Sequence, residues 1–409
     1  GVNTFTVASN STATYAIVTA AWDGAVQIID VSNPSAIVAK DAEWHNMING
    51  KGFTQLYQPS NGAEIFTVAS NSTATYALVT DVGKDDNNQA DGGVQIIDVS
   101  NPSAIVATDA ARDGDPGFTQ LQGAHSADIF TVASNSTATY AIVTAIGNWG
   151  ITDAIARGVQ IIDVSNPSAI VAKAAYTSTT IQFPWGVDTF TIGTSTYAAV
   201  AGYSANTVQI LDISDPTNIT AVDSLVDGGS LELAGPVELD IFTVGASTYA
   251  AVAAYGDNGV QIIDVSDPTN ITAVDSLVDG GSVKLDHPYN VDTFTIGLTK
   301  YAIVPSSTWE ENDGSLQIIQ LFTDEEFMKK SINISLSETL SLTDSPSKAA
   351  DISISETLSF TDTTTGTKDT RVVELSETLS LADTISKSAD VSLSESVSLT
   401  DALSIDGTT

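Results

Sequence analysis

Short apolar stretches alternate with polar turns over the first 322 residues, and the same four stretches return in the same order several times. In residues 129–174 they read IFTVAS, TYAIVT, GVQIIDVS and AIVAKA, with the polar connections NSTA and NPS after the first and third. Each stretch is rich in Val, Ile, Thr or Ala and bounded by turn residues, as β-strands are. The pattern therefore predicts a unit of four short strands joined by tight turns.

A recurring Phe marks six copies of this unit, 52 to 64 residues apart: Phe5, Phe66, Phe130, Phe190, Phe242 and Phe294. A four-stranded sheet of this size cannot bury both of its faces alone, so neighbouring copies must stack. Four strands per copy are typical of β-propeller blades. We therefore expect an all-β fold, with a six-bladed β-propeller of four-stranded blades over residues 1–322, a hinge over 323–331 and short tandem β repeats over 332–409.

The sixth unit departs from the others. Its third stretch reads LQIIQLF, with Gln320 where the other units carry Asp, and no obvious fourth strand follows. Three sources could supply that strand: residues upstream of Gly1, the segment INISL at 332–336, or a neighbouring molecule. Closure by the two chain ends is common in propellers and favours the upstream source. A strand from a neighbour would make the protein polymerise.

The third stretch, GVQIIDVSNP in the third unit, recurs five times and resembles the LVIVD repeat of bacterial and archaeal surface proteins. The resemblance implies an exported propeller, often without known activity, and hence an extracellular or cell-surface location. Its Asp precedes Ser, Asn and Pro, which is a turn-closing pattern, so we interpret this Asp as structural. The five copies end at Asp30, Asp98, Asp163, Asp212 and Asp264.

The connections between strands fall into two classes, which a propeller places on opposite faces. Those after the first and third strands are short and nearly constant, whereas the others vary in length and content. A rigid scaffold with variable aromatic loops on one face is a common design for binding surfaces. The variable face is our candidate site for a protein or carbohydrate ligand; alternatively its large residues plug gaps above the blades. These residues are Trp22, Trp44, Trp149, Trp185, Trp309, His45, His125 and His287.

The constant face carries five acceptor sequons for N-linked glycosylation, at Asn10, Asn71, Asn135, Asn218 and Asn270. The sequon is specific in spacing, but Asn followed by Ser and Thr is also ordinary turn chemistry. The sequence therefore leaves two interpretations open, glycosylated turns and plain turns.

Acidic or amide residues lie two positions before each recurring Phe: Asn3, Glu64, Asp128, Asp188, Asp240 and Asp292. In a closed ring they form one layer at the mouth of the channel. That layer could hold a cation or ordered water, but we favour the interpretation that each carboxylate accepts backbone hydrogen bonds at its own strand start. A second candidate calcium site is the loop 81–93, with Asp81, Asp85 and Asp86; it lacks the EF-hand spacing. Calcium is therefore the one cofactor that the sequence suggests.

The chain has 14 Lys plus Arg against 50 Asp plus Glu and a formal net charge of −36. This charge repels phosphate backbones, so we expect no nucleic-acid partner. The absence of cysteine excludes disulfides and thiolate metal sites. No apolar run reaches the length of a transmembrane helix, so we expect no membrane insertion within this chain. The start at Gly1, without Met or a signal-like stretch, is typical of a processed or partial chain.

After Asp324 a second repeat begins, with ISLSETLSLTD as its first copy. Strand alternation places Glu338 on the apolar face, and equivalent glutamates follow at Glu356, Glu377 and Glu395. Four stacked like charges would require a cation or Lys, so we prefer a gatekeeper role that prevents aggregation. Such Ser- and Thr-rich strands are typical of a stalk or spacer.

The sequence shows no HExxH, no GxSxG and no Gly-rich phosphate loop, so we predict that the protein is not an enzyme. The leading hypothesis is a secreted or cell-surface propeller on a stalk that mediates adhesion or binds a carbohydrate or protein. The second is a structural subunit of a surface layer or filament, self-associating through blade six or the tail strands. The third is a calcium-dependent propeller hydrolase or lyase, which rests on fold analogy alone.

Overall fold

The computed structural model describes residues 1–21, 23–44, 53–83, 92–147, 157–280, 282–297, 299–306 and 315–322. The chain divides into two compact units, Gly1–Ile334 and Ser335–Thr409. The predicted hinge and the tandem repeats with their four glutamates lie outside the described residues.

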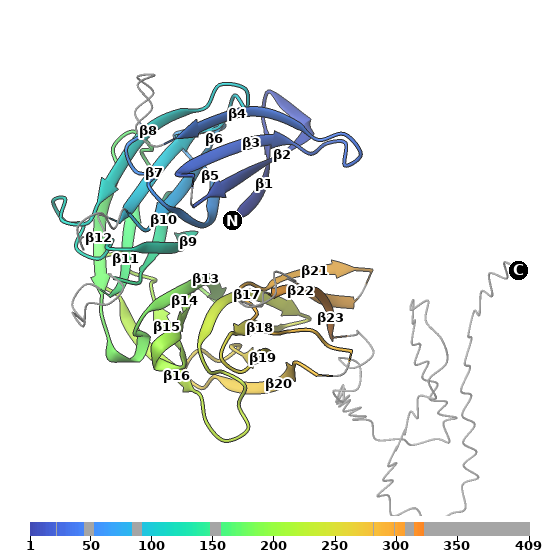
Figure 1. Ribbon diagram of the computed structural model, residues 1–409. Coiled ribbons are helices and arrows are strands. Elements are labelled where there is room, and N and C mark those ends of the chain that lie inside the picture. The colour runs from blue at the N-terminus through green and yellow to red at the C-terminus, as the bar shows by residue number, and fades with distance from the viewer. Residues whose placement is uncertain are drawn as a thin grey trace, which may run out of the picture. The chain divides into compact units, whose positions relative to one another are not determined.

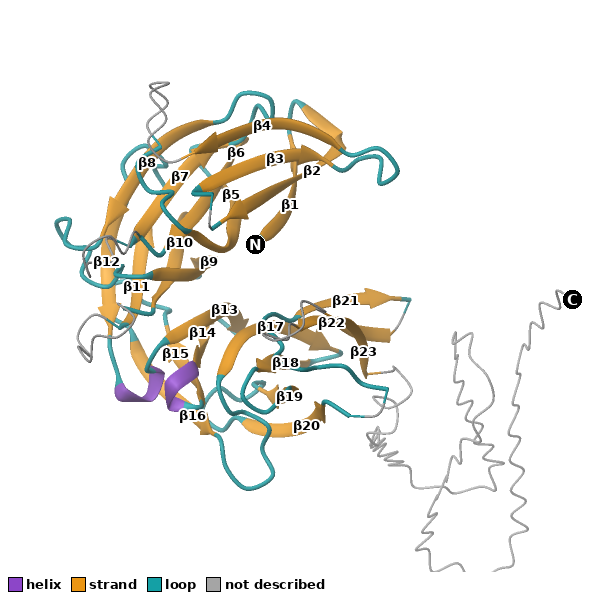
Figure 2. Ribbon diagram, viewed as in Figure 1, coloured by secondary structure: helices purple, strands orange, loops and turns teal. Residues whose placement is uncertain are grey.

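The first unit is built from six antiparallel sheets, which Figure 1 shows in chain order. Five sheets contain four strands each and the sixth contains three, so the described residues form a six-bladed β-propeller. This confirms the predicted fold class. Apart from the strands, Figure 2 shows the two short 3₁₀ helices η2 (Thr179–Ile181) and η3 (Tyr203–Ala205) in the fourth blade.

The strands follow the predicted stretches closely. Blade one contains β1 (Val2–Val7), β2 (Asn10–Ala20), β3 (Ala25–Asp30) and β4 (Val38–Trp44). Blade two contains β5 (Pro59–Val68), β6 (Asn71–Asp81), β7 (Gly93–Asp98) and β8 (Val106–Arg112). Blade three contains β9 (Ala124–Val132), β10 (Asn135–Ala145), β11 (Gly158–Asp163) and β12 (Val171–Tyr176).

The second half repeats this pattern with shorter connections. Blade four contains β13 (Pro184–Ile192), β14 (Ser195–Gly202), β15 (Thr207–Asp212) and β16 (Thr220–Val226). Blade five contains β17 (Pro236–Val244), β18 (Ser247–Ala254), β19 (Gly259–Asp264) and β20 (Thr272–Val278). Blade six contains β21 (Asp292–Ile296), β22 (Thr299–Ser306) and β23 (Ser315–Phe322).

The first strand of each blade is the innermost. β1, β5, β9, β13, β17 and β21 contact one another in that order, and the remaining strands of each blade follow outwards as a meander. No comparable contact joins β21 to β1 among the described residues. Among the described residues the sixth blade has three strands, the last of them β23, and the source of a fourth strand stays a prediction because residues 332–336 lie outside the described part.

One apolar core cluster lies at each interface between consecutive blades. Between blades two and three, for example, Val94 and Ile96 of one blade pack with Val143 and Ile162 of the next. We call the side of a blade that packs on the following blade its forward face, and the side that packs on the preceding blade its rear face. The same positions recur in the other four clusters, so alternate residues of each strand serve the two faces.

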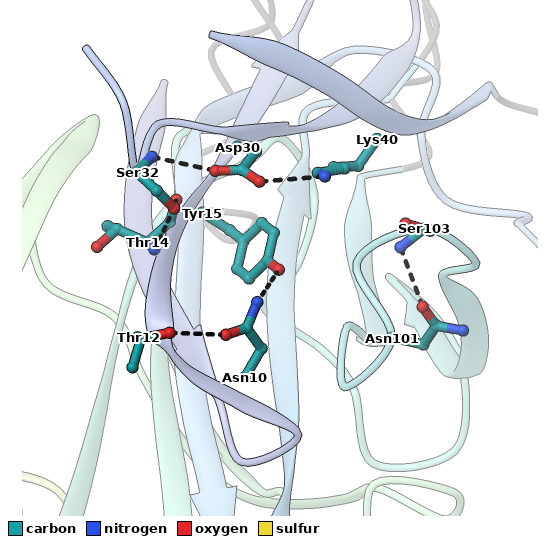
Figure 3. Close-up of polar contacts among 9 residues, drawn as sticks. All are labelled: Asn10, Thr12, Thr14, Tyr15, Asp30, Ser32, Lys40, Asn101 and Ser103. Atoms are coloured by element: carbon teal, nitrogen blue, oxygen red, sulfur yellow. Dashed lines mark hydrogen bonds and ion pairs between the residues drawn. The ribbon is translucent and has the colours of Figure 1, made fainter. Parts of the chain in front are cut away.

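The Asp that closes the third strand has the structural role expected of it. Asp30 accepts a 3.1 Å hydrogen bond from the Ser32 backbone N–H and lies 3.1 Å from the Lys40 ammonium, and the Thr14 backbone N–H donates to the Ser32 hydroxyl (Figure 3). The same turn forms after the equivalent Asp in blades two to five. These residues therefore tie the turn after the third strand to the start of the second.

A buried Gln in the third strand holds the loop that leads into blades two, three and five. In blade two the Gln95 side-chain oxygen accepts from the Thr54 backbone N–H at 3.1 Å, and its amide donates to the Asp109 carbonyl at 2.7 Å. Gln160 and Gln261 make the same pair of bonds in blades three and five. The variable loops thus rest on a fixed polar support.

Candidate binding site on the variable-loop face

Six aromatic side chains from blades three to six follow one another on the variable-loop face. We call this set the aromatic arc. Each of its members is partly exposed, and consecutive rings are in contact. The members are His125, Trp185, Tyr203, Tyr255, His287 and Tyr289.

The rings form a continuous series. The His125 and Trp185 centroids lie 4.7 Å apart, and Trp185 stacks on Tyr203 at 5.2 Å with an interplanar angle of 24°. Tyr203 and Tyr255 lie 6.2 Å apart. Tyr255 in turn contacts His287 at 4.5 Å and Tyr289 at 5.1 Å. These separations are those of favourable aromatic pairs, so each ring supports its neighbours.

The repeat places five of the six arc residues at two equivalent positions, and His287 lies at a third, seven residues before the recurring Phe. His125, Trp185 and Tyr289 each lie five residues before the recurring Phe, at or next to the start of the innermost strand. Tyr203 and Tyr255 lie six residues after the recurring Tyr, where the second strand has just ended. Both positions therefore reach the same face of consecutive blades.

Hydroxyl groups of the preceding blade fix the backbone at two of these positions. Thr80 of blade two donates to the His125 carbonyl at 2.8 Å. Thr144 of blade three donates to the Trp185 carbonyl at 2.8 Å, and the His125 Nδ1 lies 3.3 Å from that same oxygen. The two rings are therefore held by the sheet framework and not by mobile loops.

The His125 end of the arc is electrically neutral at pH 7. Burial lowers the pKa of His125 to about 4, although the hydrogen bond to the Trp185 carbonyl acts in the opposite direction. Burial also raises the pKa of Tyr203, and the neighbouring Tyr255 adds to this. At the other end of the arc, the Asp286 carboxylate lies 2.6 Å from His287 Nδ1.

The residue seven positions before the recurring Phe adopts a left-handed backbone in four blades. Glycine occupies this position at Gly123 and Gly235, with φ of 65° and 57°. Phe183 and His287 adopt the same conformation, each with φ of 51°, although a bulky side chain disfavours it. The framework around the arc thus imposes this backbone at two large side chains, one of which belongs to the arc.

Three of the eight predicted variable-face residues belong to the arc: Trp185, His125 and His287. Trp44 is exposed at the end of β4, outside the arc. Trp22, His45, Trp149 and Trp309 lie outside the described residues. The three arc tyrosines were not predicted, because Tyr also recurs in the strands of every unit and does not mark the variable loops as Trp and His do. Tyr203 and Tyr255 could have been found by aligning the repeats, since Ala21, Val82 and Ile146 occupy the equivalent positions.

Two carboxylates of the layer two residues before the recurring Phe accept backbone bonds at their own strand start, which is the interpretation that we favoured for the whole layer. Asp128 accepts from the Ile129 N–H of its own strand at 2.7 Å, and its second oxygen accepts from the Thr189 N–H of the next blade at 2.8 Å. Asp188 makes the same two kinds of bond, to Thr189 and to Ile241. The second bond is an addition to the prediction, because it joins neighbouring blades.

Four carboxyl groups of this layer have pKa values above their ordinary range. Burial raises the pKa of Glu64 to about 8, with the Asp128 charge adding to the effect, and raises that of Asp240 to about 6. Burial likewise raises the pKa of Asp128 and Asp188, and for Asp188 the charge of Asp128 is the second cause. Glu64 is therefore protonated at neutral pH, and a neutral carboxyl does not hold calcium, so Glu64 opposes a cation at its place in this layer. Asp292 is exposed at the end of the series.

The second candidate calcium site is described only in part. Asp81 accepts hydrogen bonds from the Tyr57, Gln58 and Gly83 backbone N–H groups, so it has a structural role at the end of β6. Asp85 and Asp86 lie outside the described residues. In the part of the chain that the structure describes, no three His, Asp or Glu side chains are placed to hold a metal ion. Calcium binding by the loop stays a prediction.

All five sequon asparagines are exposed and lie on the constant face, at the start of a second strand or in the turn after a third strand. In blade one the Thr12 hydroxyl donates to the Asn10 side-chain oxygen at 3.0 Å (Figure 3), and Asn71 and Asn135 make the same contact. The geometry is thus that of an ordered turn with an accessible amide.

A shallow hollow of about 300 Å³ lies away from the arc, lined by Thr54, Ala107, Thr108, Asp109 and Ala110. The Asp109 carboxylate there accepts from the Ile170 backbone N–H of blade three at 2.8 Å. Its one charged group therefore joins blade two to blade three.

Among the described residues, no helix has the length and apolar character needed to span a membrane.

Comparison with known families supports the repeat assignment. The sequence pattern of the LVIVD repeat matches residues 14–41, 89–108, 154–178, 196–227 and 248–279. The chain contains LVIVD repeats. Each matched segment ends within or just after the fourth strand of one of blades one to five, and the divergent sixth blade has no matched segment. A sequence comparison with curated proteins finds no match.

Solved structures with partial similarity include two proteins named as enzymes. An exo-beta-1,3-galactanase from Clostridium thermocellum shares 10% identity, with 68% of this chain and 62% of that chain covered and a TM-score of 0.41. A periplasmic gluconolactonase from Pseudomonas aeruginosa shares 9% identity, with 75% of this chain and 85% of that chain covered and a TM-score of 0.49. A hypothetical selenium-binding protein from Sulfolobus tokodaii shares 11% identity, with 75% of each chain covered and a TM-score of 0.48. The chain thus spans less than two thirds of the galactanase, and similarity this low transfers no activity.

Proposed function

We propose that this LVIVD-repeat propeller is a non-catalytic binding module whose aromatic arc takes a neutral carbohydrate. The observation that carries the proposal is the continuous series of six partly exposed rings across blades three to six. Aromatic rings offer flat apolar faces beside polar tips. A sugar ring offers the matching combination, with C–H groups on its faces and hydroxyl groups at its edge.

Three further properties favour this class of ligand. The arc is a continuous series of partly exposed rings, and its extent over four blades suits an extended chain of sugar units. His125 is neutral at pH 7, and the net charge of −36 repels anionic polymers. The framework bonds from Thr80 and Thr144 hold the first two rings in place before a ligand arrives, which lowers the entropy that binding must overcome.

Affinity electrophoresis with a panel of neutral polysaccharides tests the proposal. We expect retardation by at least one of them, and a loss of about ten-fold in affinity for Trp185→Ala and for Tyr255→Ala. Trp44→Ala is the matched control, because Trp44 is exposed on the same face but outside the arc. Absence of binding across the panel, or equal effects of the Trp185 and Trp44 variants, would contradict the proposal. Thermal melting of each variant reports whether it is folded.

The non-catalytic part of the proposal is tested separately. Asp128 and Asp188 each use both carboxylate oxygens for backbone hydrogen bonds, which speaks against a set of catalytic carboxylates converging at the channel mouth. We therefore expect that prolonged incubation with a bound polysaccharide, with calcium added, releases no new reducing ends. Release that disappears in an Asp128→Asn variant would favour a propeller hydrolase instead.

We further propose that the module acts at the cell surface or outside the cell, in adhesion. The support is the likeness of its repeats to those of surface proteins and the five exposed sequons on the face opposite the arc. Protease treatment of intact source cells, followed by detection with an antibody against the propeller, measures this location. Complete protection of the protein until the cells are broken would contradict it.

A further inference from the structure

The two terminal blades leave apolar faces uncovered that every interior blade buries. On the forward face of blade six, Leu316 is 64% exposed and Ile318 is 55% exposed. Their equivalents in blade two, Val94 and Ile96, are fully buried against blade three. Ile296 of blade six is likewise exposed, whereas the equivalent valine of blade two is buried.

The rear face of blade one shows the complementary pattern. Ile37 is 62% exposed, whereas the equivalent Ile105 of blade two is fully buried against blade one. Val2 is also exposed, although Ala63 at the same position of blade two is buried. Blade six therefore exposes a forward face and blade one exposes a rear face. Faces of these two kinds pack together at the five interfaces between consecutive blades.

The polar groups of this interface are present as well. At the three interfaces between blades three and six, the carboxylate two residues before the Phe accepts the backbone N–H one residue before the Phe of the next blade, as Asp240 does from Thr293 at 3.0 Å. In blade six the equivalent carboxylate is Asp292, which is exposed. In blade one the equivalent donor is the Thr4 backbone N–H. Blades six and one thus carry both the apolar side chains and the hydrogen-bonding groups that a sixth interface of this kind would need.

We propose that the forward face of blade six packs on the rear face of blade one of a second copy, so that the chain associates head to tail. The described structure leaves both faces open within one molecule, since β21 makes no contact with β1 comparable to those between the other innermost strands. A second copy offers the same surface that each interior blade already binds. Because the two faces differ, the contact is heterologous, and it extends into filaments or closes into larger rings.

Two physical consequences distinguish this association from a nonspecific one. The interface buries mainly apolar side chains, whereas each copy carries a net charge of −36. Salt screens the repulsion between copies, so association strengthens as ionic strength rises. Each contact also uses the forward face of one copy and the rear face of another. A substitution in one face therefore prevents addition of a further copy at that face only.

Sedimentation velocity of the full chain over a range of concentrations, at low and high salt, is the first measurement. We expect a series of oligomers that grows with concentration and with salt. Leu316→Lys and Ile37→Lys alone should each sediment as monomers, because each loses one of the two faces. Val226→Lys is the matched control, an exposed valine on the outer strand of blade four, and should associate like the unmodified chain.

The decisive arm is an equimolar mixture of Leu316→Lys and Ile37→Lys. One variant retains the rear face and the other the forward face, so the mixture should form dimers and nothing larger. A mixture that stays monomeric, together with an unmodified chain that is monomeric at every concentration, would overturn the proposal in favour of closure within one molecule. Undiminished oligomers in both lysine variants would overturn it as well, because association would then come from another part of the chain. Far-ultraviolet circular dichroism of each variant confirms that it is folded.

Discussion

The Asp188 carboxylate of blade four accepts a 2.7 Å hydrogen bond from the Ile241 backbone N–H of blade five. Its other oxygen accepts from Thr189 in its own strand at 2.7 Å. This side chain thus connects two sheets close to the channel, although burial and the neighbouring Asp128 charge raise its pKa well above the usual range. Asp188 stabilises the contact between the two blades by accepting hydrogen bonds, whereas ionisation of its buried carboxyl group is unfavourable.

Substitution of Asp188 tests this balance. Asn retains an oxygen acceptor without a charge, whereas Ala leaves the Ile241 N–H without this partner. We therefore expect Asp188→Ala to be less stable than Asp188→Asn by about 1–3 kcal/mol at pH 7, measured by urea unfolding. Asp292→Ala is the control, since this exposed equivalent in blade six should change stability by much less. Equal stability of the Ala and Asn variants at position 188 would contradict the interpretation.

Glu64 predicts a pH dependence of stability. Its pKa is raised from 4.5 to about 8, mainly by burial. The stabilising effect of its proton is complete below pH 4.5 and is lost as the pH rises through 8, because the folded state holds a proton that the unfolded chain has released. The full effect is at most about 5 kcal/mol.

The matching experiment follows the melting temperature from pH 5 to pH 9. We expect the unmodified protein to lose stability over this range and Glu64→Gln to lose less. Glu232→Gln, at a partly exposed glutamate, should follow the unmodified curve and thereby separates the effect of Glu64 from the repulsion of the whole acidic chain. Parallel curves for the unmodified protein and Glu64→Gln would rule out the assigned pKa.

The support of the loops by a buried Gln gives a third prediction. Gln95→Ala removes bonds to Thr54 and Asp109 from a fully buried position. We expect a loss of about 2 kcal/mol in unfolding free energy, because buried polar groups are left unpaired. Gln27 occupies the same position in blade one but is exposed, so Gln27→Ala should change stability by less than about 0.5 kcal/mol. The comparison fails if both variants lose the same amount in urea unfolding.

The sequons on the constant face give a fourth prediction. In a host with N-linked glycosylation we expect added glycan mass at the exposed Asn10, and its loss in Thr12→Val, which removes the sequon. Asn101 is an internal control, because it is exposed on the same face but Pro102 follows it and prevents modification. Peptide mapping that finds Asn10 unmodified, or Asn101 modified, would contradict the assignment.

Much of the fold was predictable because the repeat can be aligned with itself. The register in which Tyr140 pairs with Phe130 and Asp163 follows directly from the recurring stretches, and among the described residues the blade that carries Gln320 has three strands. Local bonds were predictable for the same reason: the bond from Ile129 to Asp128 lies at the start of its own strand, as expected.

What the sequence could not supply depends on how one blade approaches the next. The bond from Thr189 to Asp128 joins residues 61 positions apart, and no local pattern specifies it. The arc was missed in part for the same reason, since the contact between Tyr203 and Tyr255 joins blade four to blade five. Only the packed sheets bring such pairs into contact.

The bonds between blades have a consequence for how such a molecule can evolve. Three carboxylates of the inner layer, Asp128, Asp188 and Asp240, each accept a backbone N–H of the next blade, so the side chain of the donor residue does not matter there. A duplicated unit would bring its own acceptor and would satisfy its predecessor with any residue at the donor position. Units four and five, which both contain TAVDSLVDGG, are similar enough to be the product of such an event. Gain or loss of a whole unit by recombination therefore requires no compensating substitution at the inner layer.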